Sequence, residues 1–246
     1  MGAPFLPLLL GLLFLSEFAA LASEEDPYEQ RRIRMVQAIE AHAARARSDL
    51  GRTTLDARVL EVMRRVPRHE FVPRWLRKEA YHDAALPIGL GQTISQPFVV
   101  ALMTDLLRIE SGHVVLEVGT GSGYQAAVLA HLARRVYTIE IVPDLGRAAA
   151  ERLERLGYEN IVTRIGDGYR GWEEYAPFDR ILVTAAAARV PPPLIQQLKP
   201  GGRIVIPLGA VSATQQITLV EKDAAGEVTT RALLPVAFVP LTRERE

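Results

Sequence analysis

Apolar residues first recur at helical spacing shortly after residue 50. They occupy positions i, i+3, i+4 and i+7 of one stretch, namely Val59, Val62, Met63 and Val66. This spacing gives a helix one apolar face, and the proline at position 67 ends the pattern. We therefore predict a helix that ends before Pro67, with Thr53, Thr54 or Asp56 as its N-cap.

A second helix is predicted over residues 97–109, where the apolar positions again follow the helical spacing. Ser95-Gln96-Pro97 precedes it, in the order of a capping side chain followed by a proline in the first turn. The passage between the two helices, residues 68–91, is rich in proline and glycine. A connection of this length is typical of a functional loop.

From residue 114 onward, β-rich segments alternate with helical ones. The predicted strands are residues 114–118, 136–142, 161–165, 181–184 and 203–207, and the predicted helices are residues 122–134, 143–156 and 194–198. Strands separated by helices predict βαβ units, and therefore a parallel sheet in a doubly wound α/β fold. Residues 216–221 and 228–233 flank a turn, which predicts that the sheet ends in an antiparallel hairpin.

The chain is long enough for one large domain, and 48% of its residues are apolar, which excludes disorder as its main state. We expect residues 23–246 to form this domain. Its parts would be a helical and loop region over residues 53–110, a ligand-binding core over residues 111–208, and C-terminal strands over residues 209–246.

The charge and residue composition argue against several classes of site. The 29 basic residues balance the 29 acidic ones, so the whole chain has no net field that would hold a polyanion, and no nucleic-acid partner is expected. With no cysteine there is no thiol nucleophile, and the five histidines lack the close spacing of metal ligands, so no metal site is expected. One basic cluster is expected to be a solvated face rather than an RNA site: Arg64, Arg65, Arg68, Arg74, Arg77 and Lys78.

The N-terminal segment differs from the rest of the chain. Residues 1–22 are almost entirely apolar, with Glu17 as the only charge and a small-x-small ending at Ala20-Leu21-Ala22. This pattern resembles a secretory signal peptide and is short for a stable membrane span. Against export, no basic residue precedes the apolar run, and Met35 offers an alternative start.

A glycine-rich turn joins the strand over residues 114–118 to the next helix. Its sequence, Gly119-Thr120-Gly121-Ser122-Gly123, has the spacing G-x-G-x-G. A dinucleotide site has G-x-G-x-x-G, and Tyr124 stands where its third glycine would be. Glycines allow a sharp turn and let a ligand lie against the backbone at a helix N-terminus. The turn therefore predicts a nucleoside ligand, the alternative being a turn that binds nothing.

Three carboxylates narrow the choice of ligand. Glu140 ends the next predicted strand, where it can accept hydrogen bonds from both hydroxyls of a ribose. Asp167 follows the third strand, next to Gly168, and can accept a hydrogen bond from the exocyclic amine of an adenine. Glu117 precedes the glycines and would repel a phosphate but attract an ammonium or sulfonium group. Together they point to S-adenosylmethionine, although each acid alone could be a solvated residue at a strand end.

Residues 115–124 (VLEVGTGSGY) resemble the cofactor loop of the protein-L-isoaspartate O-methyltransferases. Further segments carry the same resemblance: residues 65–73 (RVPRHEFVP), 86–89 (LPIG), 91–97 (GQTISQP), 166–168 (GDG), 177–179 (PFD), 184–186 (TAA), 198–202 (LKPGG), 207–209 (PLG) and 238–241 (FVPL). The glycine turn is shared by many methyltransferases, whereas GQTISQP is peculiar to this family. The resemblance covers the chain from about residue 35 to its end, and the apolar N-terminal segment is the main departure.

The resemblance implies a class I methyltransferase fold and a monomeric repair enzyme. Such an enzyme transfers the methyl group of S-adenosylmethionine to the free α-carboxylate of L-isoaspartyl and D-aspartyl residues in damaged proteins, and the ester then closes to a succinimide. A carboxylate is already ionised at neutral pH, so its attack needs positioning rather than a general base. The expected cofactor contacts are Glu117, Gly119, Thr120, Gly121, Gly123, Glu140, Asp167 and Gly168.

Ser95 is the active-site residue that the resemblance implies, with a hydroxyl that holds the substrate carboxylate. From position alone it could equally be the N-cap of the following helix. We expect Thr93 and Ile94 to shape the same loop. Thr184 and Ala185 begin a run of small residues on the substrate side, where many methyltransferases of amino groups have an Asn/Asp-Pro-Pro-aromatic motif.

Other interpretations stay open at this point. The same fold could methylate RNA or a small molecule, the glycine turn could serve a nicotinamide oxidoreductase, or the domain could bind the cofactor without turnover. The family resemblance and the cytosolic supply of cofactor favour the cytoplasm, whereas the apolar N-terminal segment favours export.

Overall fold

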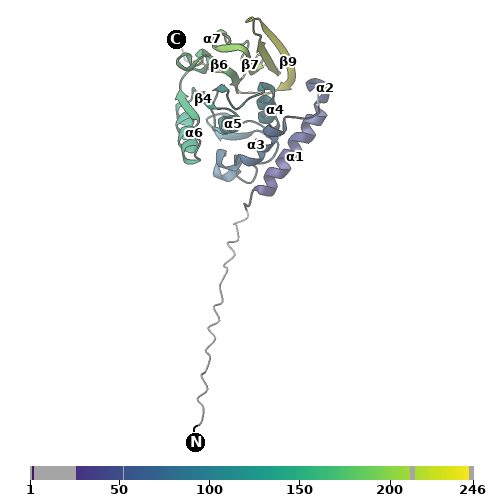
Figure 1. Cartoon of the computed structure of the whole chain (residues 1–246), viewed down its shortest axis with the longest axis vertical. Coiled ribbons are helices and arrows are strands. Elements are labelled where there is room, and N and C mark those ends of the chain that lie inside the picture. The colour runs from purple at the N-terminus through teal and green to yellow at the C-terminus, as the bar shows by residue number, and fades with distance from the viewer. Residues whose placement is uncertain (1, 3–25, 52, 211–213, 244–246) are drawn as a thin grey trace.

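The computed structural model describes residues 2, 26–51, 53–210 and 214–243 (Figure 1). The signal-like segment lies almost entirely outside the described residues. Within the described residues, no helix is long and apolar enough to cross a membrane.

A seven-stranded sheet forms the centre of the molecule, in the order β5-β4-β3-β6-β7-β8-β9. Its strands are β3 Val114–Val118, β4 Arg135–Glu140, β5 Ile161–Ile165, β6 Phe178–Val183, β7 Leu198–Leu208, β8 Gln215–Lys222 and β9 Val228–Val236. The first five strands in this order pair in parallel, and β8 and β9 are antiparallel. The predicted βαβ units and closing hairpin are therefore confirmed, although β7 begins at Leu198 instead of residue 203.

Helices cover both faces of this sheet, as the predicted doubly wound fold requires. They are α1 Glu29–Arg45, α2 Arg47–Leu50, α3 Ala57–Arg65, α4 Pro97–Leu107, α5 Tyr124–Ala130, α6 Pro143–Arg155 and α7 Pro192–Gln196. Side chains alternate along β3, so Val115 packs in the cluster that contains residues of α1, α3, α4 and α5. Leu116 and Val118 pack in the opposite cluster, with Trp172 and with Leu194 of α7.

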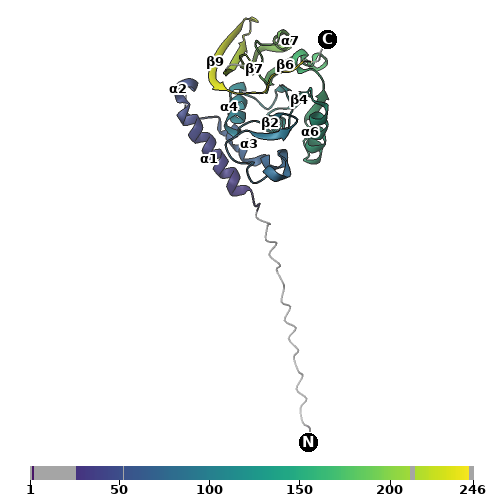
Figure 2. The same ribbon diagram turned by 180° about the vertical axis from the view of Figure 1, so that it is seen from behind.

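Helix α1 was not predicted from the sequence. It buries Met35, Val36, Ile39 and Ala43 along one face. It lies against α3 and α4 on the outside of the molecule, as Figure 2 shows from behind. The long loop that follows α3 contains two short 3-10 turns and a small antiparallel hairpin, formed by β1 Leu86–Gly89 and β2 Gln92–Ile94.

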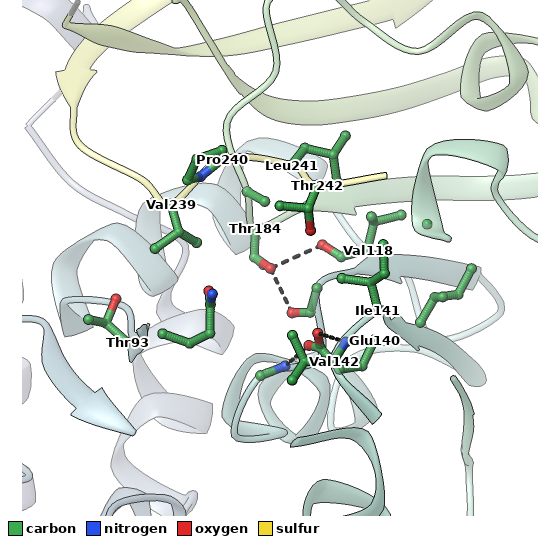
Figure 3. Close-up of a pocket in the computed structure, with 16 residues that line it drawn as sticks. Thr93, Val118, Glu140, Ile141, Val142, Thr184, Val239, Pro240, Leu241 and Thr242 are labelled. Carbon is green, nitrogen blue, oxygen red and sulfur yellow. Dashed lines mark hydrogen bonds between the residues drawn. The ribbon is translucent and has the colours of Figure 1, made fainter. Parts of the chain in front are cut away.

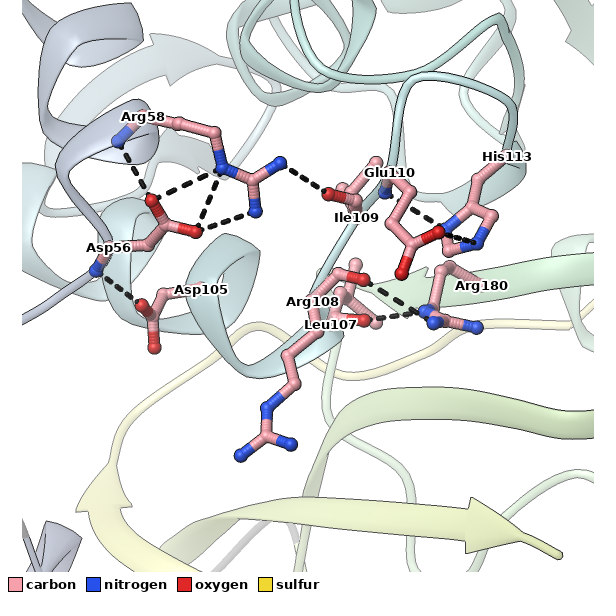
Figure 4. A network of polar contacts seen from close by, with 9 residues as sticks. All are labelled: Asp56, Arg58, Asp105, Leu107, Arg108, Ile109, Glu110, His113 and Arg180. Atoms are coloured by element: carbon pink, nitrogen blue, oxygen red, sulfur yellow. Dashed lines mark hydrogen bonds and ion pairs between the residues drawn. The ribbon is translucent and has the colours of Figure 1, made fainter.

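Polar contacts join the start of α3, the C-terminal end of α4 and the sheet (Figure 4). Asp56 is the N-cap of α3, as predicted, and its Oδ1 accepts a hydrogen bond from the Arg58 N–H at 2.8 Å. The backbone N–H of Asp56 donates to Asp105 Oδ1 at 2.7 Å, which ties the start of α3 to α4. At the C-terminal end of α4, the Arg180 Nε donates to the carbonyl of Leu107 at 2.5 Å. These contacts hold α4, and with it the loop in front of α4, against the sheet.

Candidate active site

The glycine-rich turn connects β3 to α5 through backbone conformations that favour glycine. Gly119, Gly121 and Gly123 have φ angles of +98°, +53° and +87°. A Cβ on Gly119 would lie 2.3 Å from Thr184 Oγ1, too close for any real contact. Both the backbone conformation and the neighbouring strand therefore require glycine at position 119.

Thr184 binds this turn from the end of β6. Its Oγ1 lies 3.0 Å from the carbonyl oxygen of Val118 and 2.6 Å from that of Gly119, and its backbone N–H donates to Val118 O at 2.9 Å (Figure 3). The two strand ends and the turn are thus held together by a single small residue. Thr184 and Ala185 line the pocket above the turn.

Glu140 lies at the end of β4 and lines the same pocket (Figure 3). Its Oε2 accepts a hydrogen bond from the Gly121 N–H at 2.7 Å, and its Oε1 accepts one from the Val142 N–H at 2.9 Å. An ionised carboxylate has about four lone-pair sites, so each oxygen can accept a further hydrogen bond. Glu140 therefore holds the turn in shape and can also accept hydrogen bonds from a ligand.

Asp167 follows β5 at the same edge of the sheet. Its Oδ1 accepts a hydrogen bond from the Tyr169 N–H at 2.9 Å. Its Oδ2 is buried, lies 4.0 Å from Arg243 Nε and makes no hydrogen bond with a described residue. Gly168, next in the chain, lines the pocket, and a Cβ there would lie 2.4 Å from Val118 Cγ1. Asp167 Oδ2 can therefore accept a hydrogen bond from an amine group.

Glu117 differs from its expected role. Its side chain is fully buried, and its Oε2 accepts a hydrogen bond from Thr138 Oγ1 at 2.5 Å, which lies 2.6 Å from Thr120 Oγ1. Burial raises the pKa of the Glu117 carboxyl to about 8 and so favours its neutral form at neutral pH. Glu117 therefore supports the turn from below, through Thr138 and Thr120, instead of presenting a negative charge to a ligand.

We call the cavity above the turn the glycine-loop pocket. Its floor includes Gly119, Gly121, Glu140, Gly168 and Thr184. Its opposite wall is residues 239–242, labelled in Figure 3. This segment is held by Ala186, whose N–H donates to Val239 O at 2.8 Å and whose carbonyl accepts from the Leu241 N–H at 2.7 Å. Sequence reasoning gave this wall no role, although the FVPL resemblance over residues 238–241 was a signal for it.

A second cavity, the outer pocket, lies next to the first. It is lined by Ser95 and, among others, by His42, Gln96, Phe98 and the end of β9. Thr93 and Thr184 line both cavities, as well as a small connecting pocket between them. Ile94 and Ser95 also line the connecting pocket, together with the glycine turn. The structure thus brings Thr93, Ile94 and Thr184 of the predicted substrate-side residues to the glycine turn, whereas Ala185 lines only the glycine-loop pocket.

Ser95 is not the N-cap of α4. The N-cap position is Gln96, which makes no capping hydrogen bond through its side chain. Instead, Asp83 Oδ1 accepts a hydrogen bond from the Phe98 N–H at 2.9 Å. The hydroxyl of Ser95 has no hydrogen bond to another described residue, so the capping interpretation is wrong and the hydroxyl is available to a ligand.

Arg68 also differs from expectation, because it is fully buried and not part of a solvated face. Its Nε donates to the carbonyl of Ala80 at 2.7 Å, and its Nη2 donates to the carbonyl of Ser95 at 2.7 Å. Its guanidinium lies 4.8 Å from the ring centroid of Tyr124, the first residue of α5. Arg68 therefore links the Ser95 loop to the helix that follows the glycine turn. The neighbouring Arg64 and Arg65 are exposed and pair with a glutamate, as a solvated face would.

The fold and these pockets define a class of protein. A doubly wound sheet, a G-x-G-x-G turn after β3 and a carboxylate at the end of β4 are the features of a class I methyltransferase. The family model "Protein-L-isoaspartate(D-aspartate) O-methyltransferase (PCMT)" matches residues 47–246, so the chain belongs to this family.

Individual relatives agree with this assignment. Protein-L-isoaspartate O-methyltransferase 2 of Syntrophobacter fumaroxidans is 58% identical over 235 residues, which cover 96% of this chain and 95% of that one. A solved structure described as a protein-L-isoaspartate O-methyltransferase has a TM-score of 0.73 at 28% identity and covers 85% of this chain, which spans only 65% of that longer one. A protein described as a putative member from Plasmodium falciparum, solved in complex with S-adenosyl-L-homocysteine, has a TM-score of 0.70 at 24% identity over 89% of this chain and 100% of that one.

The activity of the chain is that of its family. It is a carboxyl methyltransferase that uses S-adenosylmethionine and acts on isoaspartyl residues in proteins, in the repair of damaged chains. Membership of this family excludes two of the earlier interpretations, a nicotinamide oxidoreductase and a domain that binds the cofactor without turnover.

Proposed function

We propose that the glycine-loop pocket holds S-adenosylmethionine and that the outer pocket holds the isoaspartyl residue, with methyl transfer through the connecting pocket. The observation that carries this proposal is the lining of the connecting pocket. Its residues are Thr93, Ile94, Ser95, Val100, Gly119, Thr120, Gly121, Ser122, Tyr124, Gln125 and Thr184. They supply hydroxyl, amide and apolar groups and include no carboxylate, histidine, lysine or arginine. Such a lining suits an acceptor that is already ionised and needs no general base.

The residues around the glycine-loop pocket fit the adenosine part of the cofactor. Glu140 accepts hydrogen bonds from the ribose hydroxyls, and Asp167 Oδ2 accepts one from the adenine amine. Gly119 and Gly121 let the ligand lie against the backbone of the turn, with Gly168 and Ala185 also lining the pocket, whereas Gly123 packs against Leu153 and shapes the turn. Thr120 and Glu117 keep the turn in place from below. When bound, S-adenosylmethionine supplies a methyl group on a positively charged sulfur, which a carboxylate oxygen attacks directly.

Ser95 orients the acceptor in this proposal. Its hydroxyl donates a hydrogen bond to the substrate α-carboxylate, while Arg68 holds its carbonyl and so fixes the loop. Thr93 and Ile94 form the adjacent wall of the loop. The gain comes from alignment, since a carboxylate held in line with the methyl group needs no further activation. L-isoaspartyl and D-aspartyl residues are the expected acceptors.

The test is a pair of substitutions at Ser95. Ser95→Ala removes the donor and is expected to lower kcat/KM for an isoaspartyl peptide about tenfold or more, with cofactor affinity unchanged. Ser95→Asp is expected to be worse, because its charge faces the incoming carboxylate. Neither change should alter thermal stability much, since Asp83 and not Ser95 caps α4. Ser111→Ala, an exposed serine in the turn before β3, is the matched control. An active, stable Ser95→Asp protein would place the acceptor elsewhere.

We further propose that residues 23–246 act as one domain, as a monomer, in the cytoplasm and without a nucleic-acid partner. The cytoplasmic supply of S-adenosylmethionine supports this location. Sedimentation of the purified protein tests the oligomeric state. Sequencing the N-terminus of the native protein tests the location, because a mature end near Ser23 in a periplasmic fraction would show export.

A further inference from the structure

A hydrogen-bonded bridge closes the outer pocket at its far end. His42 of α1 places its Nδ1 3.0 Å from Asp83 Oδ2, and Gln96 Nε2 donates to the same oxygen at 3.0 Å. The other oxygen of Asp83 accepts the hydrogen bond from the Phe98 N–H. The bridge therefore joins α1, the loop before β1 and the start of α4, and His42, Gln96 and Phe98 all line the outer pocket.

This bridge fixes the His42 ring in one orientation. The ring stacks on Phe98, with centroids 3.9 Å apart and an angle of 3° between the planes. Asp83 occupies Nδ1 and Phe98 covers one face of the ring, and 33% of the side chain is exposed. A carboxylate oxygen can only accept, so Nδ1 donates in this contact, and Nε2 is the ring nitrogen left for a ligand. No described residue forms a hydrogen bond with Nε2.

The opposite side of the outer pocket is mostly apolar. It consists of residues 234–239, at the end of β9 and beyond it. An isoaspartyl residue bound at Ser95 is part of a polypeptide, so the peptide groups on either side of it lie in or at the mouth of the outer pocket. A peptide N–H that loses its water there needs an acceptor, and His42 Nε2 provides one at the pocket edge.

We propose that His42, held by Asp83, is a specificity-determining residue that accepts a hydrogen bond from a backbone N–H of the substrate next to its isoaspartyl residue. This inference rests on the proposed placement of the acceptor at Ser95. The family match begins at residue 47 and so does not include His42. The N-terminal helix thereby contributes to recognition of the substrate chain, while the reacting carboxylate stays with Ser95.

The first part of the test removes the nitrogen and keeps the ring. His42→Phe retains a planar side chain to stack on Phe98, and its KM for an isoaspartyl hexapeptide is expected to rise about threefold to tenfold. The kcat and the dissociation constant for S-adenosylmethionine are expected to stay the same. His69→Phe is the matched control, because His69 stacks on Tyr28 at 3.8 Å in a similar way but lines none of the three cavities of the site. This control also loses the contact between His69 Nδ1 and the Tyr81 hydroxyl at 2.6 Å, so its thermal stability is measured as well, and its KM and kcat are expected to stay the same.

The second part pairs the enzyme variants with modified substrates. Each backbone N–H next to the isoaspartyl residue is replaced in turn by N-methyl, and kcat/KM is measured with the unmodified enzyme and with His42→Phe. With the unmodified enzyme, we expect one N-methyl peptide to have a kcat/KM about threefold to tenfold lower than that of the parent peptide. With His42→Phe, we expect the same N-methyl peptide and the parent peptide to have equal kcat/KM. Equal losses with both enzymes would overturn the role of His42. If His42→Phe does not fold, His42→Leu takes its place in the same comparison. An unmodified enzyme that leaves the parent hexapeptide unmethylated would contradict the proposed function itself.

Discussion

The backbone N–H of Phe98 donates to Asp83 Oδ1 at 2.9 Å, so a carboxylate fifteen residues earlier in the chain caps helix α4. A negative charge at this end of a helix is also favoured by the helix dipole. Because Asp83 provides the cap, Ser95 does not have to provide it. The hydroxyl of the serine beside the helix start is therefore not needed as a cap, and in the proposed function it is the group that holds the substrate.

Removing the Asp83 cap is expected to reduce stability. Asp83→Ala should lower the free energy of unfolding by about 0.5 to 2 kcal/mol, the usual effect of losing a capping side chain. Asp83→Asn keeps an oxygen acceptor and should cost less. Urea unfolding measures both effects, with Glu151→Ala, at an exposed position in the middle of α6, as the control, expected to change stability by about 0.5 kcal/mol or less. If Asp83→Ala unfolds like the unmodified protein, the cap does not stabilise α4.

Two glycines with positive φ allow the cost of backbone strain to be measured separately from the cost of a steric clash. Gly157 has a φ angle of +78° and nothing within 4 Å of its position for a Cβ, so Gly157→Ala should cost about 1 kcal/mol. Gly119→Ala adds the contact with Thr184 Oγ1 and should cost more and weaken cofactor binding. Adding Thr184→Ala to Gly119→Ala should recover part of the loss. Thermal unfolding and calorimetry with S-adenosylmethionine measure these effects, and equal costs at the two glycines would contradict the steric argument.

Glu140 is expected to bind the ribose. Glu140→Ala should raise the dissociation constant for S-adenosylmethionine about tenfold to a hundredfold, since a hydrogen bond to a charged group contributes about 1.5 to 3 kcal/mol. The same change removes the acceptor for the Gly121 N–H, so the turn should also loosen. Glu151→Ala, on the exposed side of α6, is the control. A folded Glu140→Ala protein with unchanged affinity in calorimetry would rule out the ribose assignment.

The buried Glu117 makes stability depend on pH in a definite direction. Burial raises its pKa from the ordinary value of 4.5 to about 8 in the folded protein, so between these values the folded chain keeps a proton that the unfolded chain has lost. Stability therefore falls as pH rises from about 5 to 8. Glu117→Gln should remove this fall and be more stable at pH 8, by on the order of a few kcal/mol. Unfolding curves of both proteins across this range check it. A stability difference that does not change with pH would show that Glu117 is already ionised when folded.

Two shortened chains test the N-terminal region. A chain that starts at Ser23 should methylate normally, because the pockets are formed by residues beyond it. A chain that starts at Met35 loses the stacking of Tyr28 on His69 and the hydrogen bond from Arg31 to the Lys78 carbonyl. We expect it to be less stable by about 1 to 3 kcal/mol. If the Ser23 form folds but is inactive, the apolar segment belongs to the enzyme.

Local patterns predicted the sheet well. The strands over residues 114–118 and 161–165 were predicted with the bounds that the structure shows, because short β-rich runs are bounded there by polar and glycine residues. Helix α1 was missed because its many charged residues hide the apolar spacing of Met35, Val36, Ile39 and Ala43. Its contribution to the outer pocket was missed with it.

Contacts between distant residues could not be predicted from the chain. Asp83 lies fifteen residues before Phe98, whose N–H it caps, and nothing local distinguishes Asp83 from an ordinary loop acid. Arg68 was counted among its basic neighbours, since only the folded structure shows that it is buried between the Ser95 loop and Tyr124. The sequence shows that Glu117 directly precedes the glycine turn, but it does not show that the side chain is buried. That burial raises the pKa of Glu117 and favours its neutral form.

The wall formed by residues 239–242 affects when the enzyme first becomes able to act. The glycine turn and Glu140 are synthesised about a hundred residues earlier than this wall, so the glycine-loop pocket is complete only when the last part of the chain has been made. In the proposed function this pocket holds the cofactor. Cofactor binding would then stabilise only the nearly complete chain by mass action, and it would not assist the early steps of folding.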